Sequence, residues 1–239
     1  MVQINQALRE LTLKIVYYGP ALSGKTTNLI SLHERVSENV RGRLLTVDTK
    51  DDRTLFFDML PVFFRASNDL KVKIKLYTVP GQVIHAATRR LVLQGADAVA
   101  FVADAQKSAT QANNDAWRNL MDDLRSNGLD PGTMPIVIQF NKMDLPDVKT
   151  TAEIAEAQSR GREPIFPAVA VRGEGVVETL RGLLQLAFRD LDRRYGLGAK
   201  LRLSEDEFLG EIFRSLDERG ASPTPDRPVG QAGGTRGGR

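Results

Sequence analysis

One short segment constrains the fold more than any other feature of this sequence. It reads Gly19-Pro20-Ala21-Leu22-Ser23-Gly24-Lys25-Thr26 and matches the pattern G-x-x-x-x-G-K-[ST]. A β-rich apolar run over residues 13–18 precedes it, and residues 26–39 have a helical pattern. In such a strand–loop–helix unit the glycines let backbone N–H groups point inward, and the positive helix end adds to their field. The segment therefore predicts a phosphate-binding loop.

Short apolar runs alternate with helical patterns along most of the chain. The expected strands cover residues 13–18, 43–47, 71–76, 98–102, 135–140 and 165–170. The clearest helices cover residues 26–39, 110–126 and 175–194. Strands separated by helices predict an α/β fold with a doubly wound, mostly parallel, six-stranded sheet flanked by helices. Together with the phosphate-binding loop, this is the fold of P-loop NTPases.

One expected strand carries a row of positive charge. Residues 71–76 alternate strictly, and Lys71, Lys73 and Lys75 share one face. Such a row could bind phosphate, but it is more typical of the solvated face of an edge strand, which it protects from aggregation. We therefore expect residues 71–76 at an edge of the sheet.

The character of the chain changes after Tyr195. A glycine-containing break is followed by a capping-box pattern, with Ser204 and Glu207 at its ends. An apolar helical stripe comes next and consists of Phe208, Leu209, Ile212, Phe213 and Leu216. We expect the phosphate-binding domain to cover residues 1–195, a linker and amphipathic helix to cover 196–219, and a disordered Gly/Pro-rich tail to cover 220–239. Whether the helix packs on the domain or offers its stripe to a partner stays open.

The phosphate-binding loop has expected contacts at each position. Lys25 is expected to reach the β- and γ-phosphates, and the Thr26 hydroxyl is expected to bind Mg²⁺. Further nucleotide contacts are expected from Gly19, Ala21, Ser23, Gly24 and Thr27. The loop alone does not separate GTPases from kinases or ATPases.

A second motif selects the base. Asn141-Lys142-Met143-Asp144 directly follows residues 135–140, and ligands bind at the carboxyl ends of parallel strands. The Asp144 carboxylate can accept hydrogen bonds from the N1–H and 2-amino groups of guanine, which adenine does not offer in that arrangement. We expect Asn141 to brace the loop, Lys142 to cover the base with its stem, and the Ala170 N–H to contact the guanine carbonyl. The two motifs together predict binding of GTP and GDP.

At these residues the chain resembles the Ras-like small GTPases, and more closely the bacterial MglA-type (mutual gliding motility) GTPases of cell polarity. The stretches that carry the resemblance are Lys14–Pro20, Asp52–Asp58 and Leu76–Gln82, within a match over roughly residues 5–195. The resemblance implies a molecular switch that hydrolyses GTP slowly and controls polarity or motility. It also implies that nucleotide and Mg²⁺ order residues 49–60 and 78–90.

The resemblance implies roles in hydrolysis as well. The Gly81 N–H would contact the γ-phosphate, and Gln82 would orient the attacking water. Thr54 would bind Mg²⁺ and the γ-phosphate, and Arg53 would act as an arginine finger. Without the resemblance, Arg53 reads as a surface residue paired with a neighbouring Asp. The expected catalytic residues are Lys25, Arg53 and Gln82, and the expected metal ligands are Thr26 and Thr54.

Thr78 departs from the usual Ras-like pattern, which has an Asp here as an outer ligand of Mg²⁺. A hydroxyl is a weaker partner for metal-bound water, so the metal would be held less firmly or by another carboxylate. The candidates are Asp48, Asp51, Asp52 and Asp58, and the sequence does not choose among them.

Partners are implied next to the first switch. The run 55–63 contains Leu55, Phe56, Phe57, Met59, Leu60 and Phe63, of which about half should be core. The others could form a surface patch. The resemblance implies that a Roadblock-fold (MglB-like) activating protein docks near here, and that polarity effectors act downstream.

Composition limits the remaining possibilities. The 239 residues contain no cysteine, which excludes disulfides, thiolate metal sites and prenyl or palmitoyl anchors. No apolar run reaches membrane-spanning length, so we expect a cytoplasmic protein that protein partners recruit to a cell pole. The net charge of +3 comes without a dense basic stripe, which argues against nucleic acid as a partner.

Other functions stay open at this point. The chain could be a GTP-binding scaffold with little hydrolysis if Thr78 weakens the metal site. A P-loop kinase for a small metabolite is a second possibility, although the N-K-x-D motif speaks against it. An RNA-associated GTPase is a weaker third, suggested by the tail that contains Gly and Arg.

Overall fold

The sheet is built around β2 (Glu10–Tyr18), which pairs in parallel with β5 (Lys71–Thr78) on one side and β6 (Ala98–Asp104) on the other. The structure, a computed structural model, describes residues 2–5, 7–38, 40–48, 56–66, 68–82 and 85–217. β2 alternates between two cores: Leu13 and Ile15 face one, and Val16 and Tyr18 face the other. A strand buried on both faces therefore ends at the phosphate-binding loop.

The sheet has eight strands in the described part of the chain, in the order β3-β4-β5-β2-β6-β7-β8, with β1 paired to β2. The remaining strands are β1 (Gln3–Asn5), β3 (Leu45–Asp48), β4 (Phe56–Arg65), β7 (Ile136–Asn141) and β8 (Ile165–Pro167). β5, β2, β6, β7 and β8 are parallel, whereas β1 and β4 run antiparallel to their neighbours. The mostly parallel α/β fold is thus confirmed, but the count of six strands is wrong because β1 and β4 were not predicted.

β4 escaped prediction because Pro61 interrupts its pattern. Proline is disfavoured inside a strand because it lacks an N–H. Here the Pro61 carbonyl accepts from Gly42 N at 2.8 Å, so the backbone edge of Pro61 faces away from β5 and no β4–β5 hydrogen bond is lost. The strand alternates normally around it: Leu60 and Val62 are buried, and Phe63 is 42% exposed. The expected mixture of core and surface residues in this segment is therefore confirmed for its described part.

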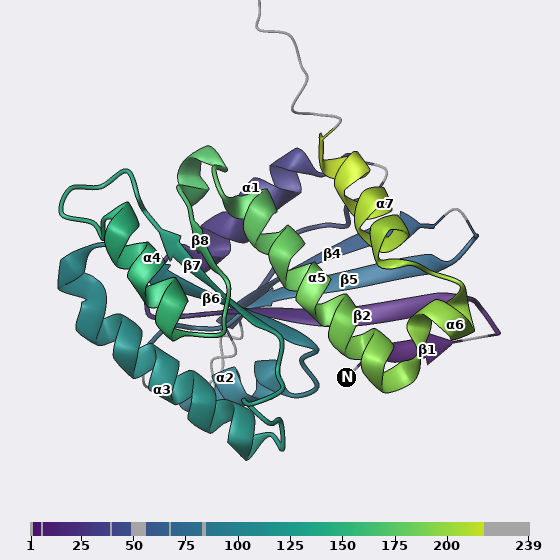
Figure 1. The fold of residues 1–239 in the computed structure, drawn as a ribbon, viewed down its shortest axis with the longest axis horizontal. Coiled ribbons are helices and arrows are strands. Elements are labelled where there is room, and N and C mark those ends of the chain that lie inside the picture. Colours follow the sequence, from purple (N-terminus) through teal and green to yellow (C-terminus); the bar gives the residue numbers. More distant parts are fainter. Residues whose placement is uncertain are drawn as a thin grey trace, which may run out of the picture.

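Helices cover both faces of the sheet (Figure 1). On one face lie α1 (Lys25–Arg35), α5 (Val176–Tyr195), α6 (Leu197–Leu201) and α7 (Glu205–Asp217). On the other lie α2 (Ala86–Leu93) and α3 (Thr110–Ser126), with α4 (Thr151–Arg160) packed at the margin through Ile154. No helix in this described part is both long and apolar enough to cross a membrane.

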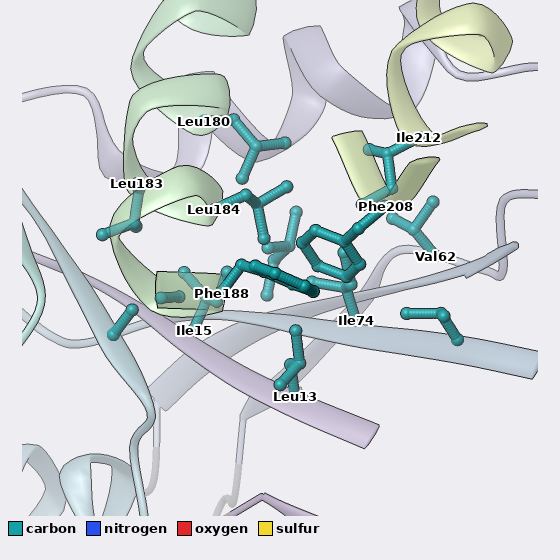
Figure 2. Packing of buried hydrophobic residues seen from close by; sticks show 14 of the residues in the cluster. Leu13, Ile15, Val62, Ile74, Leu180, Leu183, Leu184, Phe188, Phe208 and Ile212 are labelled. Atoms are coloured by element: carbon teal, nitrogen blue, oxygen red, sulfur yellow. The ribbon is translucent and has the colours of Figure 1, made fainter. Parts of the chain in front are cut away.

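The C-terminal helix α7 packs on the domain. Phe208 and Ile212 are 2% and 1% exposed and point from α7 toward Phe188 and Val62 (Figure 2). The rings of Phe188 and Phe208 lie 5.1 Å apart. The predicted capping box is confirmed, because Glu207 N donates to Ser204 Oγ at 3.2 Å and Ser204 N donates to Glu207 Oε2 at 3.0 Å. Phe208, Ile212 and Phe213 of the stripe are therefore part of the core, Leu209 packs against it, and the side chain of Leu216 lies outside the described residues. The boundaries at 195 and 219 stay a prediction. The predicted tail, 220–239, lies outside the described residues.

The expectation that residues 71–76 form an edge strand is wrong. β5 lies between β4 and β2, and its lysines line the solvated outer face of an interior strand. Lys73 Nζ lies 5.1 Å from the centroid of the Phe63 ring, and Lys14 Nζ lies 5.0 Å from that of Tyr77. These cation–π contacts cover part of the aromatic surface of Phe63 and Tyr77.

Candidate functional site

A cavity of about 610 Å³ opens where β2 and β5 end. This is the carboxyl end of the parallel strands, where α/β proteins bind ligands. The phosphate-binding loop forms one wall, and the segment after β5 forms the other. The lining residues are Ala21, Leu22, Gly24, Lys25, Thr26, Thr27, Thr78, Val79, Pro80, Gly81, Gln82 and His85.

The backbone of the loop is arranged for an anion. α1 begins after Gly24, whose φ of 99° is costly for other residues, and no side chain caps the helix. Its first turn lines the cavity and contains no acidic residue, so the positive end of the helix is available to an anion there. Gly81 closes in from the other wall, because a Cβ there would lie 2.3 Å from Ala21 N. The buried Ser23 Oγ has no hydrogen-bond partner among the described residues.

Lys25 lies inside the loop rather than outside it. Its Nζ donates to the carbonyl oxygens of Gly19 at 3.0 Å and Pro20 at 2.6 Å. Burial and, less strongly, the Arg89 cation lower the pKa of Lys25, Asp58 opposes both, and the net pKa is about 8. The loop therefore holds a desolvated ammonium group, and this is the group that is predicted to reach the β- and γ-phosphates.

A buried carboxylate, Asp58 on β4, is the centre of a hydroxyl cluster beside the loop. Thr26 Oγ1 donates to Asp58 Oδ2 at 2.6 Å, and Thr78 Oγ1 donates to the same oxygen at 3.0 Å. Thr46 Oγ1 donates to Asp58 Oδ1 at 2.9 Å. Asp58 is 2% exposed, so these hydroxyl donors take the place of bulk water around its carboxylate.

The cluster accounts for the unusual Thr78. Asp58 reaches from the neighbouring strand to the place that a carboxylate at position 78 would occupy. An Asp at 78 would set two negative charges side by side, whereas the Thr hydroxyl donates to Asp58. Of the four candidates, Asp58 is the one whose side chain the structure describes, and it lies at the site. Asp51 and Asp52 lie outside the described residues, as does the side chain of Asp48.

The oxygens at this position fit Mg²⁺. The Thr26 hydroxyl and the Asp58 carboxylate are hard oxygen ligands of the kind that Mg²⁺ prefers. A single carboxylate is enough for Mg²⁺ at a nucleotide site, because the ion retains several water ligands and also binds phosphate oxygens. The described residues contain no group of three or more His, Cys, Asp or Glu side chains that could hold a metal unaided. Phosphate oxygens and water would thus have to complete the shell. The predicted Arg53 and Thr54 lie outside the described residues.

Asn141 joins the two motifs. Its Nδ2 donates to Ser23 O in the phosphate-binding loop at 2.8 Å, and its Oδ1 accepts from Ala170 N at 2.9 Å. A buried Asn at the end of β7 therefore holds both loops, in the bracing position that was predicted. The Ala170 N–H is already hydrogen-bonded, so a contact with a guanine carbonyl would have to share this donor. That contact stays a prediction.

The other two residues of the motif lie beside charged partners. Lys142 adopts a φ of 67°, and its Nζ lies 2.6 Å from Asp104 Oδ2 at the end of β6. Asp144 Oδ2 lies 3.8 Å from Arg172 Nη2, and its side chain is 28% exposed. Asp144 thus keeps accessible oxygens for a base, whereas Lys142 is fixed along one side of the loop.

Sequence reasoning missed a buried amide network behind the site. Gln139 Nε2 donates to Asn28 Oδ1 at 3.0 Å and to Thr179 Oγ1 at 2.8 Å. These bonds tie β7, α1 and α5 together directly beneath the two loops. The signal was visible as one polar residue in an otherwise apolar strand, because buried polar groups are retained where they are paired.

Comparison with known proteins finds a relative that matches most of this chain. The chain is 43% identical over 190 residues to the "Mutual gliding-motility protein MglA" of Myxococcus xanthus (strain DK1622). The match covers 80% of this chain and 97% of the relative. No model of a protein family matches the chain.

Proposed function

The chain belongs to the family of MglA-type Ras-like small GTPases, and from this premise we propose that it is a molecular switch that binds GTP and GDP with Mg²⁺ and hydrolyses GTP. One observation carries the proposal furthest: Asn141 Nδ2 donates to Ser23 O at 2.8 Å across 118 residues of sequence. A phosphate-binding loop and an N-K-x-D loop are useful together only if one nucleotide spans both. The hydrogen bond between the two loops supports the binding of one nucleotide by both.

The charges of the site support a mechanism of positioning and electrostatics. Water attacks the γ-phosphorus in line, the bond to the β–γ bridging oxygen breaks, and GDP and phosphate leave. Lys25 would exchange its loop carbonyls for phosphate oxygens, and the Gly81 N–H would contact the γ-phosphate. Gln82 would orient the water, and Arg53 would neutralise charge in the transition state. Bound Mg²⁺ would supply further charge neutralisation at the β- and γ-phosphates.

We assign the metal to a hydroxyl–carboxylate pair. Thr26 and Thr54 would be direct ligands, and Asp58 would bind a metal-bound water in place of the Asp missing at position 78. This placement argues against a scaffold that barely hydrolyses GTP, because β4 would supply the carboxylate that is missing at position 78. Asp144 would select guanine by accepting from its N1–H and 2-amino groups.

Slow turnover, stimulation by a Roadblock-fold activating protein and a role in polarity or motility belong to the same proposal. The name of the relative, a mutual gliding-motility protein, supports a role in motility. The side chains of Leu45 and Phe63 are 40% and 42% exposed on β3 and β4 and support a partner surface there. We place the protein in the cytoplasm, from which partners would recruit it to a pole.

The test is nucleotide identification followed by single-turnover phosphate release. The purified protein should contain GDP or GTP, and phosphate release should be slow alone and faster with a Roadblock-fold protein. Release of adenine nucleotides, or no hydrolysis in either condition, would contradict the proposal. A Gln82→Ala variant should bind nucleotide and stall, which separates loss of chemistry from loss of binding.

A further inference from the structure

Gln82 is connected to a buried network on the far side of the cavity wall. Its backbone carbonyl accepts from Arg89 Nη1 on α2 at 2.8 Å. Arg89 Nε lies 3.2 Å from Asp123 Oδ2 on α3, and Tyr18 OH at the end of β2 donates to the same oxygen at 2.8 Å. Four elements of the chain thus meet at one guanidinium group.

The members of this network are more buried than most charged side chains. The side chains of Arg89 and Asp123 are 6% and 10% exposed, and Tyr18 is 1% exposed. Buried charges are costly, and a hydrophobic pair would serve the core at least as well. Retaining an ion pair here needs a reason beyond packing. The bond to Gln82 offers one, because the planar guanidinium fork donates in two directions at once.

We propose that Arg89 is a positioning residue that holds Gln82 in place for hydrolysis, and that Asp123 and Tyr18 fix Arg89. The inference rests on the proposed GTPase function. Arg89 contacts the backbone carbonyl of Gln82, which leaves the side-chain amide free to orient water. Catalytic geometry tolerates little error, since a misplacement of about 1 Å can cost about 100-fold in rate.

A direct electrostatic role is the main competitor. The Arg89 cation lowers the pKa of Lys25, so its charge reaches the phosphate-binding loop. Arg89→Lys separates the two roles, because Lys keeps the charge near Asp123 but cannot donate to Asp123 and Gln82 as a rigid fork.

The experiment measures single-turnover GTP hydrolysis for Arg89→Lys in the native and Gln82→Ala backgrounds. In the native background we expect kcat to fall about 10- to 100-fold, with nucleotide affinity unchanged within about twofold. In the Gln82→Ala background the same change should cost nothing further, because no amide remains to be positioned. Arg90→Lys, at the exposed neighbouring position on α2, is the matched control and should leave the rate unchanged.

A second readout does not depend on hydrolysis. His85 N donates to Gln82 O at 3.3 Å, so exchange of the His85 amide with solvent reports how firmly Gln82 is held. Arg89→Lys and, more weakly, Tyr18→Phe should accelerate this exchange, and Tyr18→Phe leaves every charge in place. If the native protein hydrolyses no GTP, the proposed function fails while this exchange still decides the positioning role. Equal slowing in both Gln82 backgrounds, or an unchanged exchange rate in Arg89→Lys, would overturn it.

Discussion

Thr26 Oγ1 donates to Asp58 Oδ2 at 2.6 Å, which joins the first turn of α1 to the beginning of β4. Asp58 also accepts from Thr78 on the adjacent strand, so a single carboxylate serves both walls of the site. Ras-like proteins usually have an Asp at the position equivalent to Thr78 on β5. Here the carboxylate is that of Asp58, on the neighbouring strand β4. Asp58 also falls within residues 49–60, the first of the two segments that the family resemblance predicts to be ordered by nucleotide and Mg²⁺.

Asp58→Asn should weaken Mg²⁺ binding while the fold persists. The amide is nearly the same size and can still accept from Thr26, but it removes the charge that balances the metal. We expect the Mg²⁺ concentration that half-saturates nucleotide retention to rise at least about tenfold, a loss of about 1.4 kcal/mol. The measurement is dissociation of a fluorescent GDP over a Mg²⁺ titration. Asp115→Asn on α3 serves as control, and equal curves for the two variants would contradict the assignment.

Moving the carboxylate back to position 78 gives a sharper test. Thr78→Asp alone should be harmful, because two carboxylates would meet where Thr78 Oγ1 now lies 3.0 Å from Asp58 Oδ2. We expect a loss of at least about 1–3 kcal/mol in unfolding free energy, the cost of a buried unsatisfied polar group, since a charge costs more. The double variant Asp58→Asn/Thr78→Asp should recover both stability and Mg²⁺ affinity. Additive losses in urea unfolding and Mg²⁺ titrations would show that the two positions do not share one role.

Local patterns predicted much of this molecule. The loop ending in Lys25 and Thr26 and the capping box at Ser204 and Glu207 depend on residues within a few positions of one another, so the sequence alone displays them. The amphipathic stripe around Phe208 predicted a helix but not the elements that the helix packs against. These are α5 and β4, which are far apart in the sequence and are brought together only by the fold.

Non-local pairing accounts for what the sequence did not reveal. β4 lies antiparallel between two strands and contains Pro61, so its sequence lacked the pattern and composition that are typical of a β-strand. The contact between Asp58 and Thr78 became visible only once the register of β4 against β5 was known. Arg89 and Asp123 lie 34 residues apart on two helices, and no periodic pattern connects them.

Lys25 should make nucleotide affinity depend on pH. Burial lowers the pKa of Lys25 to about 8 in the free protein, and bound phosphates would raise it again. Below pH 8 Lys25 is already protonated in the free protein, so the affinity for GDP is at its maximum. Above pH 8 binding must take up a proton, so GDP affinity should fall up to about tenfold per pH unit until the pKa of the complex is reached.

The measurement is the Kd for GDP between pH 6 and 10. Lys25→Arg is the control, because its guanidinium stays charged throughout and the nucleotide's own titration remains. The difference between the two profiles isolates Lys25. Parallel profiles would mean that Lys25 does not change its protonation on binding in this range.

Phe208→Ala should destabilise the whole domain, since α7 is part of its core. Phe208 is 2% exposed and packs against the ring of Phe188. Truncating a buried Phe costs about 3–5 kcal/mol through lost transfer energy and a residual cavity. Urea unfolding measures the loss. Asp206→Ala, at an exposed position of the same helix, is the control, and similar midpoints for both variants would show that α7 contributes little.

Asp144→Asn should change base selection without changing phosphate binding. The carboxylate accepts two guanine donors, whereas an amide presents its NH₂ group to one of them and leaves that contact unpaired. We expect GTP affinity to fall at least about 100-fold, while any affinity for ATP stays the same. Asp144 lies 3.8 Å from Arg172, so Arg172→Gln reports how much of the loss comes from that ion pair alone. Competition binding with GTP and ATP measures the change, and equal loss for both nucleotides would place Asp144 in the loop's stability rather than in recognition of guanine.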